Sequence, residues 1–145
     1  MSNPYQHITG SDQLIAALGE WPTFHDAEIV KFSMERSLPV EVGHNRAKLT
    51  IHVSQYASIN EGTANYQMIV TKGMLANFVF ASISDLELFD FNHQNVINSF
   101  TVSPVQTNDK ATLLVEIESI WGLSGSFKCS AVELESVEVV KIEHQ

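Results

Sequence analysis

The sequence predicts an α+β fold that is predominantly antiparallel β-sheet, with one short helix near the amino terminus. Three observations predict it: apolar residues alternate with polar ones along most of the chain, candidate strands recur about every ten residues, and one early segment has helical spacing. Short polar breaks favour a sandwich, a meander or a partly open barrel over alternating βαβ units. With 145 residues, 44% of them hydrophobic, residues 1–145 are expected to form one domain around one core.

The helical segment lies between Ser11 and Gly19. Ser11 is a residue type that caps helices, and Gly19 can end one. A single apolar face is formed by Leu14, Ile15 and Leu18. Beyond Pro22 the apolar period changes to two, which indicates the start of the sheet.

The first two predicted strands form a hairpin. Apolar residues alternate with polar ones over Glu28–Glu35 and again over Leu49–Val53, and Gly43, His44 and Asn45 mark a turn between them. Further strands are predicted at Tyr66–Val70, Asn77–Ala81, Leu86–Phe91, Phe100–Val105, Thr112–Glu118, Gly125–Ala131 and Val132–Ile142. The apolar phase changes within the last of these segments, which predicts a β-bulge or a break near Ser136.

Charge and cysteine content limit the classes of partner. Seventeen acidic and eight basic residues give a net charge of -9, which repels nucleic acids and anionic membrane surfaces and attracts basic proteins. The single cysteine, Cys129, cannot form an internal disulfide bond, and neither a secretory signal nor a membrane-spanning stretch is recognised. A cytoplasmic protein is therefore expected.

His25, Asp26 and Glu28 form the densest cluster of titratable residues. With a distant ligand such as His52 or His93, they could serve a small metal-dependent enzyme, which is one alternative function. Adjacent side chains diverge, however, so the spacing alone does not predict a metal site. The other interpretation is structural: Asp26 caps a turn, while Phe24 and His25 pack at the start of the strand.

Outside this cluster, no segment predicts catalysis or a cofactor. Residues 122–126 resemble a nucleophile elbow, but Ser126 stands where that motif requires glycine, so a turn between two strands is predicted. Cys129 alternates with Phe127 and Ala131, which indicates an unreactive thiol on a buried strand face.

Acidic and aromatic residues on the predicted strands are candidates for protein binding, because carboxylates steer a basic partner and aromatics supply buried area. The candidates are Asp85, Glu87, Asp90, Glu116, Glu118, Trp121, Glu133 and Glu135. Solvated strand faces that prevent edge pairing are the alternative explanation. The amide-rich stretch from Asn92 to Asn98 suits turn chemistry or contact with a partner, and self-association into a homodimer is a third functional alternative.

Three blocks of the sequence resemble the Imm50 family of bacterial immunity proteins. The first is Trp21–Ile29, with Trp21, Phe24, His25, Asp26 and Glu28; the second is Leu86–Ile97, with Asn92 and Asn95; the third is Gly122–Cys129. The resemblance implies a cytoplasmic protein that binds and neutralises the toxic domain of a polymorphic toxin, which is basic if it is a nuclease. It implies neither catalysis nor a cofactor, and no toxin-contacting residues carry over.

Overall fold

The computed structural model describes residues 3–39, 44–105 and 112–140. Over these residues the chain forms one helix and a nine-stranded sheet of order β1-β9-β4-β3-β2-β6-β7-β8-β5. The elements are β1 (Ile8–Thr9), α1 (Asp12–Leu18), β2 (Glu28–Arg36), β3 (Asn45–Ile59), β4 (Gln67–Ala81), β5 (Ser84–Phe89), β6 (Val96–Val105), β7 (Thr112–Trp121), β8 (Ser124–Cys129) and β9 (Ala131–Val139). Every neighbouring pair is antiparallel except β1 and β9, so the predicted α+β class is confirmed.

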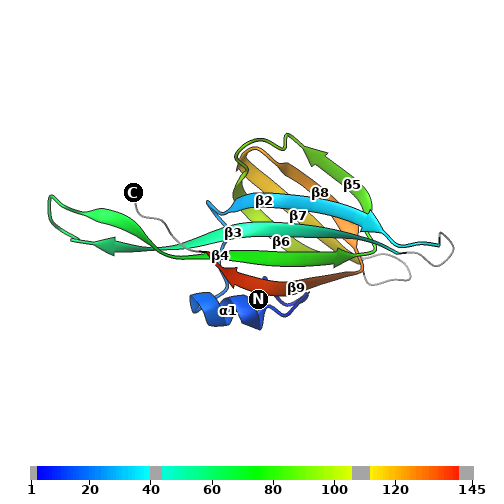
Figure 1. The fold of residues 1–145 in the computed structure, drawn as a ribbon, viewed down its shortest axis with the longest axis horizontal. Coiled ribbons are helices and arrows are strands. Elements are labelled where there is room, and N and C mark those ends of the chain that lie inside the picture. Colours follow the sequence, from blue (N-terminus) through cyan, green and yellow to red (C-terminus); the bar gives the residue numbers. More distant parts are fainter. Residues whose placement is uncertain (1–2, 40–43, 106–111, 141–145) are drawn as a thin grey trace.

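The sheet folds over on itself into two layers. One layer contains β2, β3, β4 and β9, and the other, formed by β6, β7, β8 and β5, runs obliquely behind it (Figure 1). The layers are joined where β2 pairs with β6. At that junction the ladder contains only the pair Glu28 and Val96. The sheet is therefore not closed into a barrel.

Aromatic side chains fill the space between the layers. The rings of Phe80 and Phe127 lie 4.9 Å apart between centroids, and those of Phe78 and Phe100 lie 5.2 Å apart, both edge to face. Each pair joins a strand of one layer to a strand of the other. Such contacts contribute about 0.5–1.5 kcal/mol each beyond the burial of apolar area, so they fix how the layers stack.

The predicted helix is confirmed as α1, and it ends at Gly19, whose φ of 90° is readily adopted by glycine. The prediction that Ser11 caps the helix is wrong: its backbone is already helical and its side chain makes no capping hydrogen bond. Leu14 and Leu18 are buried in the core. Gln13 attaches the helix to β9, because its Nε2 donates a hydrogen bond to the carbonyl oxygen of Leu134 over 2.8 Å.

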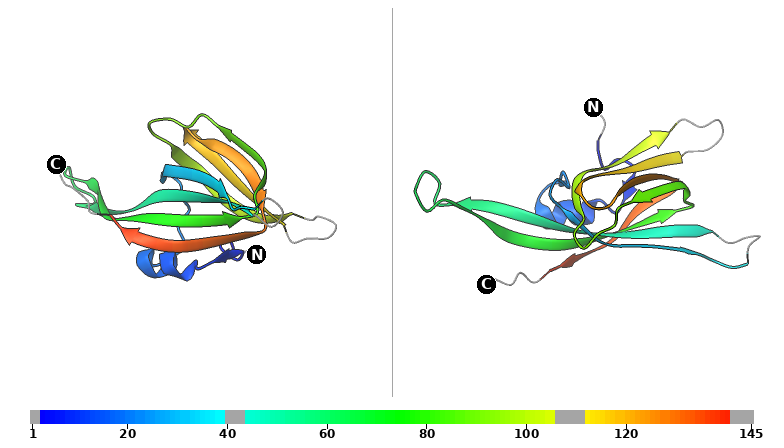
Figure 2. Two further views of the ribbon diagram at one scale, coloured as in Figure 1. Left: turned by 45° about the vertical axis from the view of Figure 1, so that its right-hand side comes forward. Right: turned by 90° about the horizontal axis from the view of Figure 1, so that it is seen from above.

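The predicted hairpin is confirmed by β2 and β3, although Gly43 lies outside the described residues. The two strands predicted at Tyr66–Val70 and Asn77–Ala81 are wrong as separate elements, because β4 runs unbroken through both. Between them, Gly73 of β4 pairs with Ser54 of β3 in the ladder. The β3–β4 hairpin extends well beyond the rest of the sheet (Figures 1 and 2).

Other strand boundaries shift in ways that the backbone explains. β5 begins at Ser84 and ends at Phe89, and the next residue, Asp90, turns the chain with a φ of 63°. Asp85 has a φ of 53° within the strand, where the pairing with β8 shifts register between Ser84 and Glu87. β6 begins at Val96, before the predicted start at Phe100, and β7 continues past Glu118 to Trp121.

The predicted bulge near Ser136 is confirmed. Asn77 and Phe78 of β4 pair with Ser136 and Leu134, which leaves Glu135 without a partner in that ladder. β9 ends at Val139, and Ile142 lies outside the described residues. The two-residue strand β1 is too short for an apolar period to reveal it. Among the described residues, no helix has the length and apolar character needed to cross a membrane.

Candidate protein-binding surface

A buried amide holds together the corner at which the two layers meet. Asn95 is 3% exposed, and its Oδ1 accepts hydrogen bonds from the backbone N–H groups of Asn92 (2.8 Å) and Leu123 (2.9 Å). Its Nδ2 donates to the carbonyl oxygen of Asn92 over 2.9 Å. Asn95 thus joins the turn after β5 to the turn between β7 and β8, so this part of the amide-rich stretch has a structural role.

The segment before β2 makes an unusual turn against the same corner. Phe24 and Asp26 have φ angles of 64° and 69°, and the backbone N–H of Asp26 donates to the carbonyl oxygen of Ile97 over 2.9 Å. Non-glycine residues adopt such angles only where the surroundings hold them. Here the ring of Phe24 is buried, 5.3 Å from Phe100 and 5.4 Å from Trp21 between centroids. The predicted packing of Phe24 is confirmed.

His25 and Asp26 lie on the outside of this turn. Both side chains are more than half exposed, and His25 Nε2 lies 3.6 Å from Asp26 Oδ1. The predicted packing of His25 at the start of the strand is therefore wrong. His25 Nδ1 lies 3.4 Å from the carbonyl oxygen of Asn98, whose Nδ2 donates to Glu118 Oε1 over 2.6 Å. Polar contacts thus run from His25 to a carboxylate on β7.

Glu28 lies apart from His25 and Asp26. It is the first residue of β2 and pairs with His52 of β3. Within the described ranges, no three or more histidine, cysteine, aspartate or glutamate side chains gather in a way that could hold a metal ion. His25, Asp26 and Glu28 therefore do not form the ligand set that the metal-dependent alternative requires.

Four of the predicted binding residues share the solvent face of the β6–β7–β8–β5 layer, and we call this the acidic face: Asp85, Glu87, Glu116 and Glu118. Ser126 of β8 pairs with Glu87 of β5 on one side and with Glu116 of β7 on the other. At about 4.8 Å between adjacent strands, the two carboxylate-bearing residues are about 10 Å apart. Serine and threonine side chains lie between the carboxylates, so the face offers hydrogen bonds as well as charge.

One lysine lies beside the acidic face. Lys128 Nζ is 3.2 Å from Asp85 Oδ2, and this partly exposed ion pair neutralises one of the four carboxylates. Glu87 and Glu116 have no basic partner among the ion pairs of the described residues. The field over the centre of the face is therefore negative.

The remaining predicted binding residues lie elsewhere. Glu133 and Glu135 are exposed on β9, in the other layer. Trp121 is 55% exposed at the end of β7, and Asp90 follows β5. The structure thus brings together half of the predicted residues and separates the other half.

Two exposed aromatic residues were missing from the predicted set. Phe89 and Phe91 are 55% and 61% exposed on either side of Asp90. Phe89 borders a hollow on the acidic face together with Glu116, Glu118 and Ser126. The apolar alternation of β5 indicates that Phe89 points to solvent, because Phe89 is out of phase with Leu86 and Leu88.

Cys129 is 2% exposed, and burial raises the pKa of its thiol to about 11. A thiol in this state is neutral at ordinary pH, as the sequence predicted for a buried strand face. Residues 122–126 form the predicted turn and the start of β8, with Gly122 at a φ of 86°. Cys129 is buried away from the acidic face, whereas Ser126 lies on that face between Glu87 and Glu116.

A family model described as immunity protein 50 matches residues 10–140. The match includes all three blocks on which the family resemblance rests. No curated protein and no solved structure matches the chain.

Proposed function

Because the chain belongs to the immunity protein 50 family, we propose that it binds a toxin domain and neutralises it by covering the surface that the toxin uses. The proposal assigns binding to the acidic face. It requires no catalytic step and no cofactor, and it places the protein in the cytoplasm of the cell that it protects from a polymorphic toxin.

The observation that supports this assignment is the position of Glu87 on β5 and Glu116 on β7, the two strands that flank β8. Carboxylates from separate segments form a negative surface with aromatic Phe89 at its border. Such a surface accelerates encounter with a basic protein, and a partly buried aromatic can then hold the complex. A toxin whose active surface binds phosphate groups is basic for the same reason, so the acidic face would occlude that surface.

The test compares two double variants that change the net charge equally. Glu87→Gln with Glu116→Gln alters the acidic face, whereas Glu133→Gln with Glu135→Gln alters β9 in the other layer. The binding partner to be tested is a candidate toxin domain from a gene adjacent to that of this chain, inactivated by substitution. At low salt the first variant should associate several-fold more slowly than the unaltered chain, and the second should not. The difference should shrink above about 0.5 M salt, because the charges are then screened.

Growth of cells that express the active toxin provides the functional readout. The unaltered chain should protect them, and the Glu87→Gln, Glu116→Gln variant should protect them less at equal abundance. Equal slowing by both double variants would show that net charge, and not the acidic face, governs encounter. A toxin that is neither bound nor inhibited by the unaltered chain would exclude the proposed function.

A further inference from the structure

The open side of the sheet leaves two strand edges free. β2 pairs with β3 along one edge, but its other edge meets β6 only at Glu28 and Val96. β5 is the last strand of the sheet and pairs only with β8. Across the described residues, the free edge of β2 beyond Ile29 and that of β5 have no strand partner. Their N–H and C=O groups are therefore available to another extended chain.

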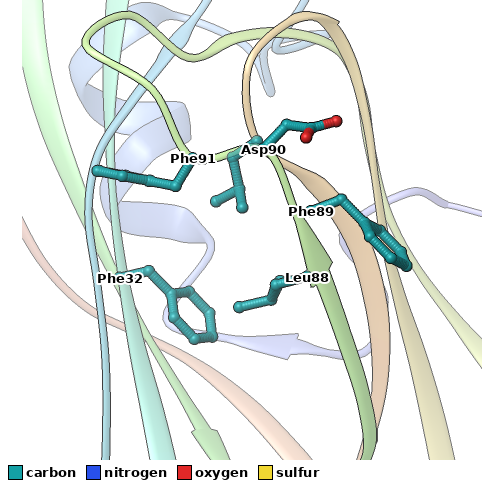
Figure 3. A pocket seen from close by; sticks show the side chains of 6 residues that line it. Phe32, Leu88, Phe89, Asp90 and Phe91 are labelled. Carbon is teal, nitrogen blue, oxygen red and sulfur yellow. The ribbon is translucent and has the colours of Figure 1, made fainter.

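Apolar side chains line the gap between these two edges, which we call the seam: Phe32, Met34, Ile83, Leu86, Leu88 and Phe91. Phe32 and Leu88 point toward one another across it, while the ring of Phe89 is directed away (Figure 3). Most of these side chains pack against the core on one side and are only partly covered on the other. The seam is thus a part of the core that the two layers do not enclose.

The seam has the shape of a trough and not of a compact cavity. A pocket of about 230 Å³ lies between Phe32 and Leu88, and a second of about 470 Å³ lies between Met34 and Leu86. Both pockets follow the same two strands. The six residues of β5 alone span about 20 Å at about 3.3 Å per residue. This length and the free backbone groups suit an extended peptide, which would form main-chain hydrogen bonds and place alternate side chains in the trough.

The seam is continuous with the acidic face around β5. Phe89 and Asp85 border pockets on both sides of this strand. A chain entering the seam therefore passes beside Glu87 and Asp90. A second copy of this protein is disfavoured as the occupant, because each copy carries a net charge of -9. Two basic residues, Arg36 and Arg46, lie with Glu35 and Asp85 at the end of the seam near Met34, whereas the charged residue at the end near Leu88 is Asp90. A basic segment therefore meets attraction at the Leu88 end.

We infer that an extended segment of the toxin domain adds as a β-strand to the seam, with apolar side chains against Phe32 and Leu88 and basic side chains toward the acidic face. This inference rests on the proposed function and specifies how the partner is held. Toxin binding would then cover the exposed part of the core and supply the strand that the open sheet lacks.

Hydrogen exchange of the backbone amides tests strand addition directly. The probe is an inactivated candidate toxin domain from a gene adjacent to that of this chain, mixed with the unaltered chain. Peptides that cover residues 30–36 and 84–91 should exchange at least tenfold more slowly in the complex. Binding accompanied by slower exchange in β7 and β8 alone would overturn strand addition and leave the immunity function intact. Failure of the unaltered chain to bind would overturn both.

Two exposed aromatic residues that lie on different sides of β5 provide the matching variants. Phe91→Ala removes a ring from the seam, and Phe89→Ala removes one from the acidic face; both side chains are more than half exposed, so folding should be retained. Phe91→Ala should raise the Kd at least tenfold, and Met34→Ala should raise it in the same direction. Val139→Ala on β9 is the control and should have no effect. Weakening by Phe89→Ala, with no effect of Phe91→Ala or Met34→Ala, would overturn the inference.

Discussion

A Cβ atom on Gly122 would lie 2.5 Å from Oδ1 of Asn95, so the two residues fit together only because position 122 has no side chain. The backbone at Gly122 also has a φ of 86°. The buried amide and the glycine therefore form one structural unit at the corner of the sheet, although they come from different blocks of the sequence.

Gly122→Ala should destabilise the protein by about 3 kcal/mol or more, because the new methyl group meets both an unfavourable φ and backbone atoms that cannot move freely. Gly19→Ala is the matched control: its φ is 90°, but a Cβ there meets nothing within 4 Å. It should cost only about 1 kcal/mol. Urea denaturation of both variants measures the difference, and equal losses would show that the contact with Asn95 is unimportant.

Asn95→Ala should lower the free energy of unfolding by about 2–4 kcal/mol. The substitution leaves the backbone N–H groups of Asn92 and Leu123 without their acceptor in a buried place, and an unsatisfied buried donor costs about 1–3 kcal/mol. Asn98→Ala provides the comparison, because the Asn98 amide bonds an exposed carboxylate instead. Thermal unfolding should show a much larger decrease in Tm for Asn95→Ala, and similar Tm values for both variants would contradict the structural role.

The sequence predicts much of the fold because burial follows a simple period. In β3 the buried residues Ala47, Leu49, Ile51 and Val53 alternate with polar ones, and Val115 and Ile117 do so in β7. The Ser11 cap was predicted wrongly because a residue type indicates only what its side chain is able to do. The sequence predicts separate strands at Tyr66–Val70 and Asn77–Ala81, whereas pairing with β3 makes β4 continuous across the residues between them.

The acidic face could be predicted only in part. Alternation shows that Glu87 and Glu116 point to solvent, but not that one strand lies between them, because strand order depends on how the layers fold together. The open edges of β2 and β5 are harder still. They depend on the departure of β6 from β2 after one recorded pair, and no local sequence signal specifies that departure.

Cys129 should react slowly with thiol reagents in the folded protein. Burial raises its pKa to about 11, whereas an unfolded thiol has a pKa of about 8.5. At pH 8 roughly a quarter of unfolded thiols are ionised, against roughly one in a thousand at the folded value. Labelling with an aromatic disulfide at pH 8 should therefore be at least a hundredfold faster in denaturant, and rapid labelling of the native protein would contradict the assignment.

The raised pKa of Cys129 also predicts how stability depends on pH. The folded state favours the neutral thiol, so this contribution to stability is fully present below the unfolded pKa and is lost as the pH rises through about 9 to 11. Over that range the unaltered protein should lose more stability than Cys129→Ala, in which no thiol ionises. Parallel losses in urea denaturation would show that the thiol does not contribute.

Phe24 and His25, adjacent residues of the block Trp21–Ile29, should differ in how much their substitution changes stability. Phe24→Ala should cost about 3–5 kcal/mol, because it removes a buried ring from between Trp21 and Phe100. His25→Ala should change stability by less than about 0.5 kcal/mol, since the ring is exposed. His25 lies beside Asn98, which bonds Glu118 of the acidic face, so its loss should weaken toxin binding while the protein remains folded. Denaturation together with a binding titration separates the two roles. Unchanged toxin affinity in His25→Ala would limit the role of this block to building the corner of the sheet.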